Sequence, residues 1–203
     1  MFYLLAKLFF HTFFRFTGGV KVEGLYNVPK VDSLIIVSNH QSLLDPLLLM
    51  AYIPRRITFL AAAYLFRIPV LNILLPVAGA IPIKCEKGDF ASFKRVLRIL
   101  EGGGVVAIFP EGGVSSDGRL RPFKPGWAYL ALKSGAPVLP VAVIGTRDVL
   151  PVGTFVPRRG RIELRVGESV TMQKKGRVRQ EDFNELNILI EDRIKSLLFW
   201  TGQ

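Results

Sequence analysis

The stretch SLIIVSNHQSLLDPLLLMAYI, from Ser33 to Ile53, contains the unit that decides the fold, a strand followed by a turn and a helix. Its first part, SLIIVSN, is a short apolar run of the kind that forms a buried strand. The run DPLLLMAYI predicts a helix with Asp45 at its cap and Pro46 in its first turn. One such unit indicates an α/β fold if the pattern repeats.

The same alternation of apolar runs and helical patterns continues to the end of the chain. It indicates an α/β class, with a single domain in which helices flank a mixed, mostly parallel sheet. RIELRVG (161–167) alternates in the manner of a sheet-edge strand. The other predicted strands are GAIPIK (79–84), VVAIFPEG (105–112) and APVLPVAVIG (136–145), and the predicted helices are DFASFKRVLRILEGG (89–103), PFKPGWAYLALKSG (122–135) and EDFNELNILIEDRIKSLLFW (181–200).

Composition points to one core and an anionic partner. At 203 residues, half of them hydrophobic, the chain can bury one substantial core. Its net charge of +11 favours nucleic acid, an acidic bilayer or a phosphorylated substrate. A mean hydropathy of +0.35 and fifteen phenylalanines favour the membrane among these. Cys85 is the only cysteine, which excludes an intrachain disulfide, and two histidines are too few for a His-rich metal site.

The amino-terminal segment MFYLLAKLFFHTFFRFTGG has the pattern of an amphipathic helix. Lys7, His11 and Arg15 fall along one stripe, and aromatic and aliphatic residues cover much of the rest. The segment lacks the basic start and the cleavage site of a signal peptide. We expect residues 1–20 to form a helix that lies in the membrane plane, with residues 21–203 as the folded domain. A helix packed on the protein's own core is the alternative.

A second apolar stretch, Ile57 to Ile83, has the length of a membrane span, for which roughly 20 helical residues suffice. Arg67 interrupts it, and prolines at 69, 76 and 82 would break a continuous helix. We therefore expect short segments joined by bends, partly buried and partly facing lipid, without a full crossing.

His40 and Asp45 form the first candidate for chemistry. On one continuous helix they would point about 140° apart, so they can meet only across a turn, which the predicted strand, turn and helix supply. A neutral imidazole can take a proton from an alcohol, and a carboxylate beside it fixes the tautomer and stabilises the imidazolium. A structural histidine and a helix-capping aspartate are the alternative interpretation of this pair alone.

The second candidate is Phe109-Pro110-Glu111-Gly112-Gly113, which places a carboxylate and a flexible turn just after a buried strand. Sites in open α/β sheets lie at such strand ends. Taken alone, Glu111 could equally be a solvated turn residue.

Together these segments resemble the glycerophospholipid acyltransferase family, typified by bacterial 1-acylglycerol-3-phosphate acyltransferases. The resemblance runs from Val37 to Val143. The shared motifs, in order, are NHQSLLD with the family's H-x4-D pattern, LFRIP (65–69), GAIPI (79–83), FPEG with DGRLRPFKPG (109–126) and APVLPV (136–141). Several motifs in the right order and spacing are far more specific than any one of them.

The resemblance implies direct acyl transfer to a lysolipid hydroxyl from acyl-CoA or acyl-carrier protein, with no cofactor, no metal and no acyl-enzyme. The product expected first is phosphatidic acid, made from 1-acylglycerol-3-phosphate in phospholipid biosynthesis. His40 and Asp45 would be catalytic, and Asn39, Glu111 and Gly112 would bind substrate. We expect the acyltransferase domain to act at an anionic lipid membrane, peripheral or monotopic on the cytoplasmic face of the cytoplasmic membrane.

The chain departs from the family pattern where acceptor phosphate is thought to bind. Val114 and Cys85 stand at two positions that are commonly arginine, and Ala62 replaces a lysine. Nearby cations could substitute, because phosphate needs charge and donors more than a fixed residue type. These are Lys84, Lys87, Arg119 and Lys124, which could also be ordinary solvated charges.

Other functions fit the sequence less well. A serine hydrolase would need G-x-S-x-G, which is absent, and the glycine run 102–104 precedes a strand instead of following one as in dinucleotide-binding folds. Basic residues near the carboxyl end suggest nucleic acid, yet aromatics do not interleave with them, so we expect no nucleic-acid partner. A different lysolipid acceptor and a noncatalytic lipid-binding relative remain as alternatives.

Overall fold

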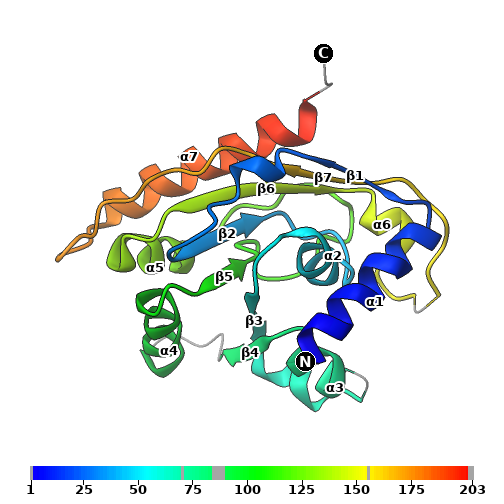
Figure 1. The fold of residues 1–203 in the computed structure, drawn as a ribbon. Coiled ribbons are helices and arrows are strands. Elements are labelled where there is room, and N and C mark those ends of the chain that lie inside the picture. The colour runs from blue at the N-terminus through cyan, green and yellow to red at the C-terminus, as the bar shows by residue number, and fades with distance from the viewer. Residues whose placement is uncertain (1, 70, 84–89, 155, 201–203) are drawn as a thin grey trace.

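A computed structural model describes residues 2–69, 71–83, 90–154 and 156–200. In this part of the chain, seven strands form one twisted sheet in the order β1-β7-β6-β2-β5-β3-β4 (Figure 1). Neighbouring strands run parallel except β6 and β7, which are antiparallel. The strands are β1 (Val20–Glu23), β2 (Leu34–Ser38), β3 (Ile57–Ala62), β4 (Ala80–Ile83), β5 (Val105–Ile108), β6 (Val138–Ile144) and β7 (Ile162–Val166).

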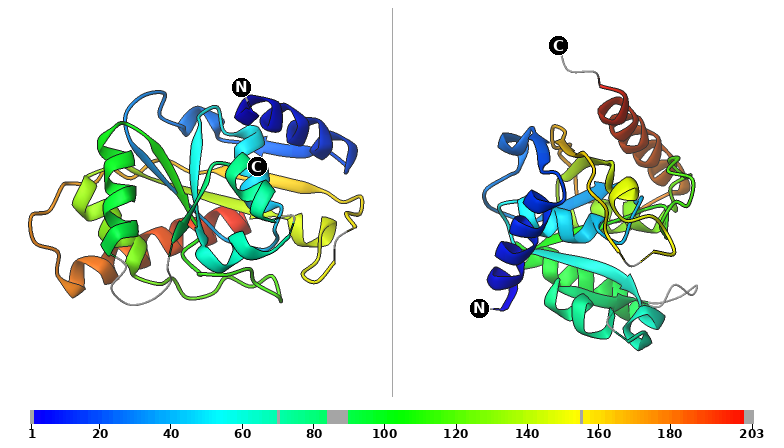
Figure 2. Two further views of the ribbon diagram at one scale, coloured as in Figure 1. Left: turned by 90° about the horizontal axis from the view of Figure 1, so that it is seen from below. Right: turned by 90° about the vertical axis from the view of Figure 1, so that its right-hand side faces the viewer.

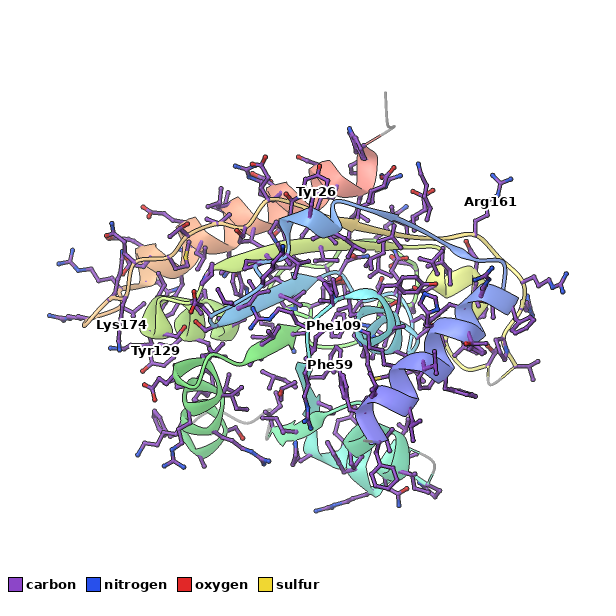
Figure 3. All side chains as sticks on the ribbon, in the orientation of Figure 1. Tyr26, Phe59, Phe109, Tyr129, Arg161 and Lys174 are labelled. Carbon is purple, nitrogen blue, oxygen red and sulfur yellow. The ribbon has the colours of Figure 1, made fainter. Side chains whose placement is uncertain are left out.

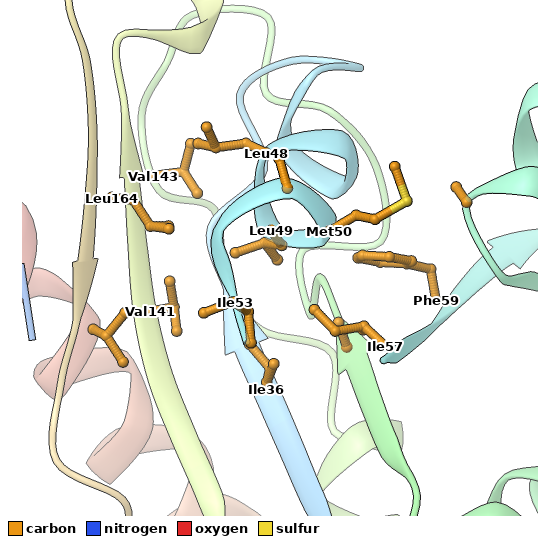
Figure 4. Close-up of a cluster of buried hydrophobic side chains, with 14 of the residues drawn as sticks. Ile36, Leu48, Leu49, Met50, Ile53, Ile57, Phe59, Val141, Val143 and Leu164 are labelled. Carbon is orange, nitrogen blue, oxygen red and sulfur yellow. The ribbon is translucent and has the colours of Figure 1, made fainter. Parts of the chain in front are cut away.

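Helices cover both faces of the sheet (Figure 2). Along β2, Leu34 and Ile36 join a core with α1 and α2, whereas Ile35 and Val37 join a core with α4, α5 and α7. Figure 4 shows part of the first core, where Leu48, Leu49 and Ile53 gather with Ile36 of β2 and with Val141 and Val143 of β6. The helices are α1 (Phe2–Phe16), α2 (Asp45–Tyr52), α3 (Leu71–Val77), α4 (Phe90–Glu101), α5 (Gly126–Ser134), α6 (Thr146–Val149) and α7 (Gln180–Phe199), with 3-10 turns η1 (Leu25–Asn27) and η2 (Ala63–Arg67).

The mixed, mostly parallel sheet and its flanking helices agree with the predicted fold class, and two details differ. The strand RIELRVG, predicted at an edge, lies between β1 and β6. Its alternation arises because one side chain in two enters the core, which says nothing about how many strands pair with its backbone. Asp45 was predicted as a helix cap, yet Leu44 is the capping residue and Asp45 is the first residue of α2.

The amino-terminal helix α1 packs on the domain through one face. Ala6 and Phe14 are buried, the Tyr3 hydroxyl accepts the Ile57 N–H, and Lys7 donates to the Ile53 carbonyl at the end of α2. Lys7 therefore turns inward, unlike the exposed His11 and Arg15 of the same predicted stripe. The opposite face of α1 exposes large apolar side chains, namely Phe2, Leu4, Leu5, Leu8, Phe9 and Phe16.

The apolar stretch from Ile57 to Ile83 forms β3, η2, α3 and β4, so it consists of short segments joined by bends as predicted. Among its described side chains, Tyr64, Ile68 and Ile73 are large, apolar and exposed. Among the described residues, no helix combines the length and the hydropathy that crossing a bilayer requires.

Candidate active site

The site begins where β2 ends and Asn39 ties it to β6. The Asn39 Nδ2 donates to the Val143 carbonyl and its Oδ1 accepts the Val143 N–H, both at 2.8 Å. The buried amide thus continues the pairing of β2 with β6 beyond the last residue of β2. This contact fixes the point at which His40 leaves the sheet, and the substrate contact expected of Asn39 stays a prediction.

His40 and Asp45 meet across the predicted turn. The Nδ1 of His40 lies 2.8 Å from Oδ2 of Asp45, a carboxylate with no exposed side-chain area. The same oxygen accepts the backbone N–H groups of Gln41, at 2.6 Å, and Ser42, at 2.8 Å. A carboxylate surrounded by donors accepts the Nδ1 proton, which leaves Nε2 of His40 with a free lone pair.

Three neighbours hold the His40 backbone and ring. Its N–H donates to Oε1 of Glu111 at 2.8 Å, and its carbonyl accepts the Ser115 N–H at 2.7 Å. Its imidazole stacks on Phe109, with ring centroids 4.1 Å apart and planes 20° from parallel. Phe109, labelled in Figure 3, directly follows β5. His40 is therefore fixed by the ends of two adjacent strands, the arrangement expected at the carboxyl edge of an α/β sheet.

The Glu111 side chain stabilises the loops at the carboxyl ends of β2 and β5. Its second oxygen, Oε2, accepts the Arg121 N–H at 3.1 Å, so the carboxylate bridges His40 to the segment that precedes α5. Burial raises the pKa of Glu111, and the hydrogen bonds from the backbone of His40 and Arg121 oppose that rise. Both carboxylate oxygens are engaged with backbone, so a further role in substrate binding stays a prediction.

Thr146 is a residue of this site that the sequence analysis did not select. Its hydroxyl lies 2.5 Å from Oδ1 of Asp45, and both side chains are fully buried. Thr146 begins α6, which is only four residues long. Its signal could have been a hydroxyl residue directly after the end of a buried strand, but that pattern is too common to identify a site by itself.

The predicted phosphate-binding cations fall into two groups. Lys84 and Lys87, with Cys85, lie outside the described residues. Lys124 lies over the backbone of Gly112, where an added Cβ would meet its Nζ. Arg119 is exposed in the same loop, and its backbone N–H donates to Asp117 at 3.0 Å.

Val114 is half-buried in this loop, at one of the two positions commonly occupied by arginine. Among the described residues, no group of three His, Cys, Asp or Glu side chains could hold a metal ion.

The arrangement can perform proton transfer at Nε2 of His40, the ring nitrogen that does not face Asp45. The His40 side chain is 14 % exposed beside the fully buried Asp45. Its free Nε2 can accept a proton from a hydroxyl, and the Asp45 carboxylate stabilises the resulting imidazolium.

Comparisons with known proteins show which proteins the chain resembles. A family model described as Acyltransferase matches residues 19–144, more than half of the chain. A chloroplastic 1-acyl-sn-glycerol-3-phosphate acyltransferase of Brassica napus is 34 % identical over 74 % of this chain and 43 % of that protein. The 1-acyl-sn-glycerol-3-phosphate acyltransferase of Borreliella burgdorferi is 34 % identical over 64 % of this chain and 54 % of that protein. The chain thus spans about half the length of these two relatives.

The fold is also found among solved structures. The crystal structure of the 1-acyl-sn-glycerophosphate acyltransferase PlsC from Thermotoga maritima superposes with a TM-score of 0.79 and 28 % identity, covering 99 % of this chain and 81 % of that one.

Proposed function

The chain belongs to the acyltransferase family, and from this membership we propose that it transfers a fatty acyl group from a thioester to a lysolipid hydroxyl. Nε2 of His40 takes the hydroxyl proton while the hydroxyl oxygen attacks the thioester carbonyl. The tetrahedral intermediate collapses, the C–S bond breaks, and the leaving thiolate receives the proton from His40. The products are an ester and a free thiol, so no acyl-enzyme is needed.

The contact between His40 and Asp45 carries this proposal. Because Nδ1 of His40 faces Asp45 at 2.8 Å, the lone pair of Nε2 is left for the acceptor hydroxyl. A general base of this kind contributes about 100- to 10,000-fold in rate.

The acceptor we favour is 1-acylglycerol-3-phosphate, with phosphatidic acid as product. Two observations support it, namely the names of the relatives described above and the cations of the loop 109–126. Lys124 and Arg119 are exposed cations of that loop, and neither has an acidic partner within salt-bridge distance among the described residues. We assign the phosphate to them together with Lys84 or Lys87. The thioester donor is acyl-CoA or acyl-carrier protein.

Membrane association belongs to the same proposal. The outer face of α1 carries six exposed large apolar side chains. Contact between so large an apolar surface and water is unfavourable. We propose that this face enters the interface of an anionic bilayer, from which the lysolipid reaches the site.

Replacing His40 tests the reaction. We expect His40→Ala to lower transfer to labelled lysolipid by at least about 100-fold and Asp45→Asn to impair it severely, with unchanged circular dichroism. The wild-type protein is assayed with acyl-CoA and acyl-carrier-protein donors. Wild-type rates in folded His40→Ala protein, or no transfer by the wild type to any lysolipid, would overturn the proposal.

The acceptor is tested separately by competition. We expect lysophosphatidic acid to outcompete monoacylglycerol, and Lys124→Gln or Arg119→Gln to raise the KM for the acceptor more than that for the donor. Lys84→Gln and Lys87→Gln belong to the same series. Lys30→Gln serves as the control. It removes an equal charge just before β2, at the amino-terminal end of that strand and so opposite the site. Equal turnover of both acceptors, with no response to any substitution, would indicate a neutral acceptor.

A further inference from the structure

The Asp45 carboxylate uses its two oxygens unequally. Oδ2 accepts three N–H groups, from the His40 ring and from the backbone of Gln41 and Ser42. Oδ1 has one hydrogen-bond donor among the described residues, the hydroxyl of Thr146 at 2.5 Å. Because Asp45 and Thr146 are fully buried, water does not replace that donor if it is lost.

The fold places Thr146 from three sides. Gly145, with φ of 81°, turns the chain from β6 into α6 at a point where an added Cβ would meet the Arg161 carbonyl. Two hydrogen bonds between the Asn39 side chain and the Val143 backbone, one donated by each residue, hold the preceding strand end. At the far end of α6, the Ser42 hydroxyl donates to the Leu150 carbonyl at 2.9 Å. The segment from Val143 to Leu150 is thus attached to the turn 39–45 on both sides of Thr146.

We propose that Thr146 is a positioning residue that orients the Asp45 carboxylate and, through it, the imidazole of His40. The inference rests on the proposed function, in which His40 is the base. Thr146 lies 101 residues from Asp45 in sequence and just beyond the segment 19–144 that the family model matches. It touches no reacting atom, so its effect on the reaction passes entirely through Asp45.

Loss of the hydroxyl has a specific chemical consequence. In Thr146→Val the side chain keeps its shape, but Oδ1 of Asp45 is buried without a donor. The carboxylate is then held about its Cβ–Cγ bond only by the three donors on Oδ2, which allow it to tilt, and the hydrogen bond from Nδ1 of His40 weakens. A fraction of the imidazole adopts the other tautomer, in which Nε2 carries the proton and cannot act as a base.

Kinetics of three variants test the inference. We expect Thr146→Val to lower kcat by about 10- to 100-fold with little change in either KM, because small misplacement of a reacting group costs about this much. Thr146→Ser keeps the hydroxyl and should remain within about threefold of wild type if the hydroxyl carries the effect. Thr154→Val removes a hydroxyl that donates to the nearby Pro151 carbonyl, its one hydrogen-bond partner among the described residues, and should retain wild-type kcat.

Histidine NMR supplies a second readout that does not depend on turnover. The chain has two histidines, so ¹⁵N-histidine labelling gives one signal set for His40 and one for His11 as internal reference. At a pH where both rings are neutral, we expect the Nδ1–H tautomer of His40 in the wild type and in Thr146→Ser, and mixed tautomers in Thr146→Val. If Thr146→Val does not fold, Thr146→Ala removes the same hydroxyl.

Three results would overturn the inference. These are wild-type kcat in Thr146→Val, an unchanged His40 spectrum in that variant, or a Thr146→Ser variant as impaired as Thr146→Val. If the wild type transfers no acyl group, the proposed function fails, while the tautomer comparison still decides whether Thr146 positions His40.

Discussion

At the scale of single residues, the two buried carboxylates of the site differ in their hydrogen-bond donors. Asp45 accepts the imidazole N–H of His40, whereas the donors to Glu111 among the described residues are the backbone N–H groups of His40 and Arg121. Asp45 therefore acts on the ring of His40 and Glu111 on its backbone. Only the first can influence which ring nitrogen carries the proton, so the two carboxylates are not interchangeable.

The raised pKa of Glu111 predicts a pH-dependent contribution to stability. Because burial raises this pKa, the folded protein holds the proton more tightly than the unfolded chain. The contribution is fully present below the unfolded value of about 4.3 and is lost as pH rises through the folded pKa. We expect the free energy of unfolding of the wild type, minus that of Glu111→Gln, to fall from pH 4 toward neutrality. Urea unfolding at fixed salt measures it, and a difference that rises with pH would contradict the prediction.

At the scale of elements, the site depends on two connections that leave neighbouring strands at the same edge. The turn 39–45 joins β2 to α2 and carries His40, and the turn at Gly145 joins β6 to α6 and carries Thr146. β2 and β6 are adjacent and parallel, so both turns lie beside each other. Hydrogen bonds join the two connections, so a change in the Gly145 turn should alter the position of His40.

Two glycines with nearly the same φ distinguish the cost of a left-handed backbone from the effect of displacing Thr146. Gly145 and Gly153 have φ of 81° and 83°, but an added Cβ meets the Arg161 carbonyl only at Gly145 and nothing within 4 Å at Gly153. Gly153→Ala should cost about 1–2 kcal/mol for the left-handed conformation. Gly145→Ala should cost more and should also lower the transfer rate, because Thr146 must move. Urea unfolding and acyl-transfer assays measure both, and equal losses in the two variants would count against the Gly145 turn.

At the scale of the molecule, helices cover both faces of the sheet, and α1 exposes more large apolar side chains than α7 does. α1 packs on one face and presents an apolar outer surface, and α7 packs on the other face (Figure 2). The positive charges are spread over the surface: Arg161 and Lys174 extend outward at opposite ends of the molecule (Figure 3). Arg165, from the basic cluster near the carboxyl end, is instead held by Glu163 and by the Leu197 carbonyl.

A matched pair of double variants tests which face meets the membrane. Deleting α1 would uncover the core around Phe14, so substitution of its exposed residues is the sharper experiment. We expect Leu5→Asp with Phe9→Asp to lower partitioning to anionic vesicles by at least about tenfold, since apolar burial at the interface is lost. Ile188→Asp with Phe199→Asp changes the charge equally on α7 and should bind nearly as the wild type does.

Vesicle flotation over a salt series measures both variants. Equal loss in the two pairs would indicate attraction by charge alone. No loss in the α1 pair would point instead to Tyr64, Ile68 and Ile73 as the apolar contact.

The sequence by itself determined the class of the fold, most of the elements and the pairing of His40 with Asp45. Apolar periodicity is a local property, so it predicted β2, β5 and α7 from the residues within each of them. His40 and Asp45 are five residues apart, and a single turn between a strand and a helix suffices to join them. Both features depend only on residues close together in the sequence, so a short segment is enough to predict them.

Only the tertiary structure decided which distant segments meet. Alternation in RIELRVG reported one buried face, but the pairing of Ile162 with Val20 put the strand inside the sheet, next to β1, which was not predicted. Lys7 turned inward because the end of α2 offered a carbonyl, and the Thr146 hydroxyl reached Asp45 because β6 lies beside β2. Periodicity records which face of an element is buried. The partner on that face depends on how elements far apart in sequence pack, because hydrogen bonds between them exist only after the sheet has formed.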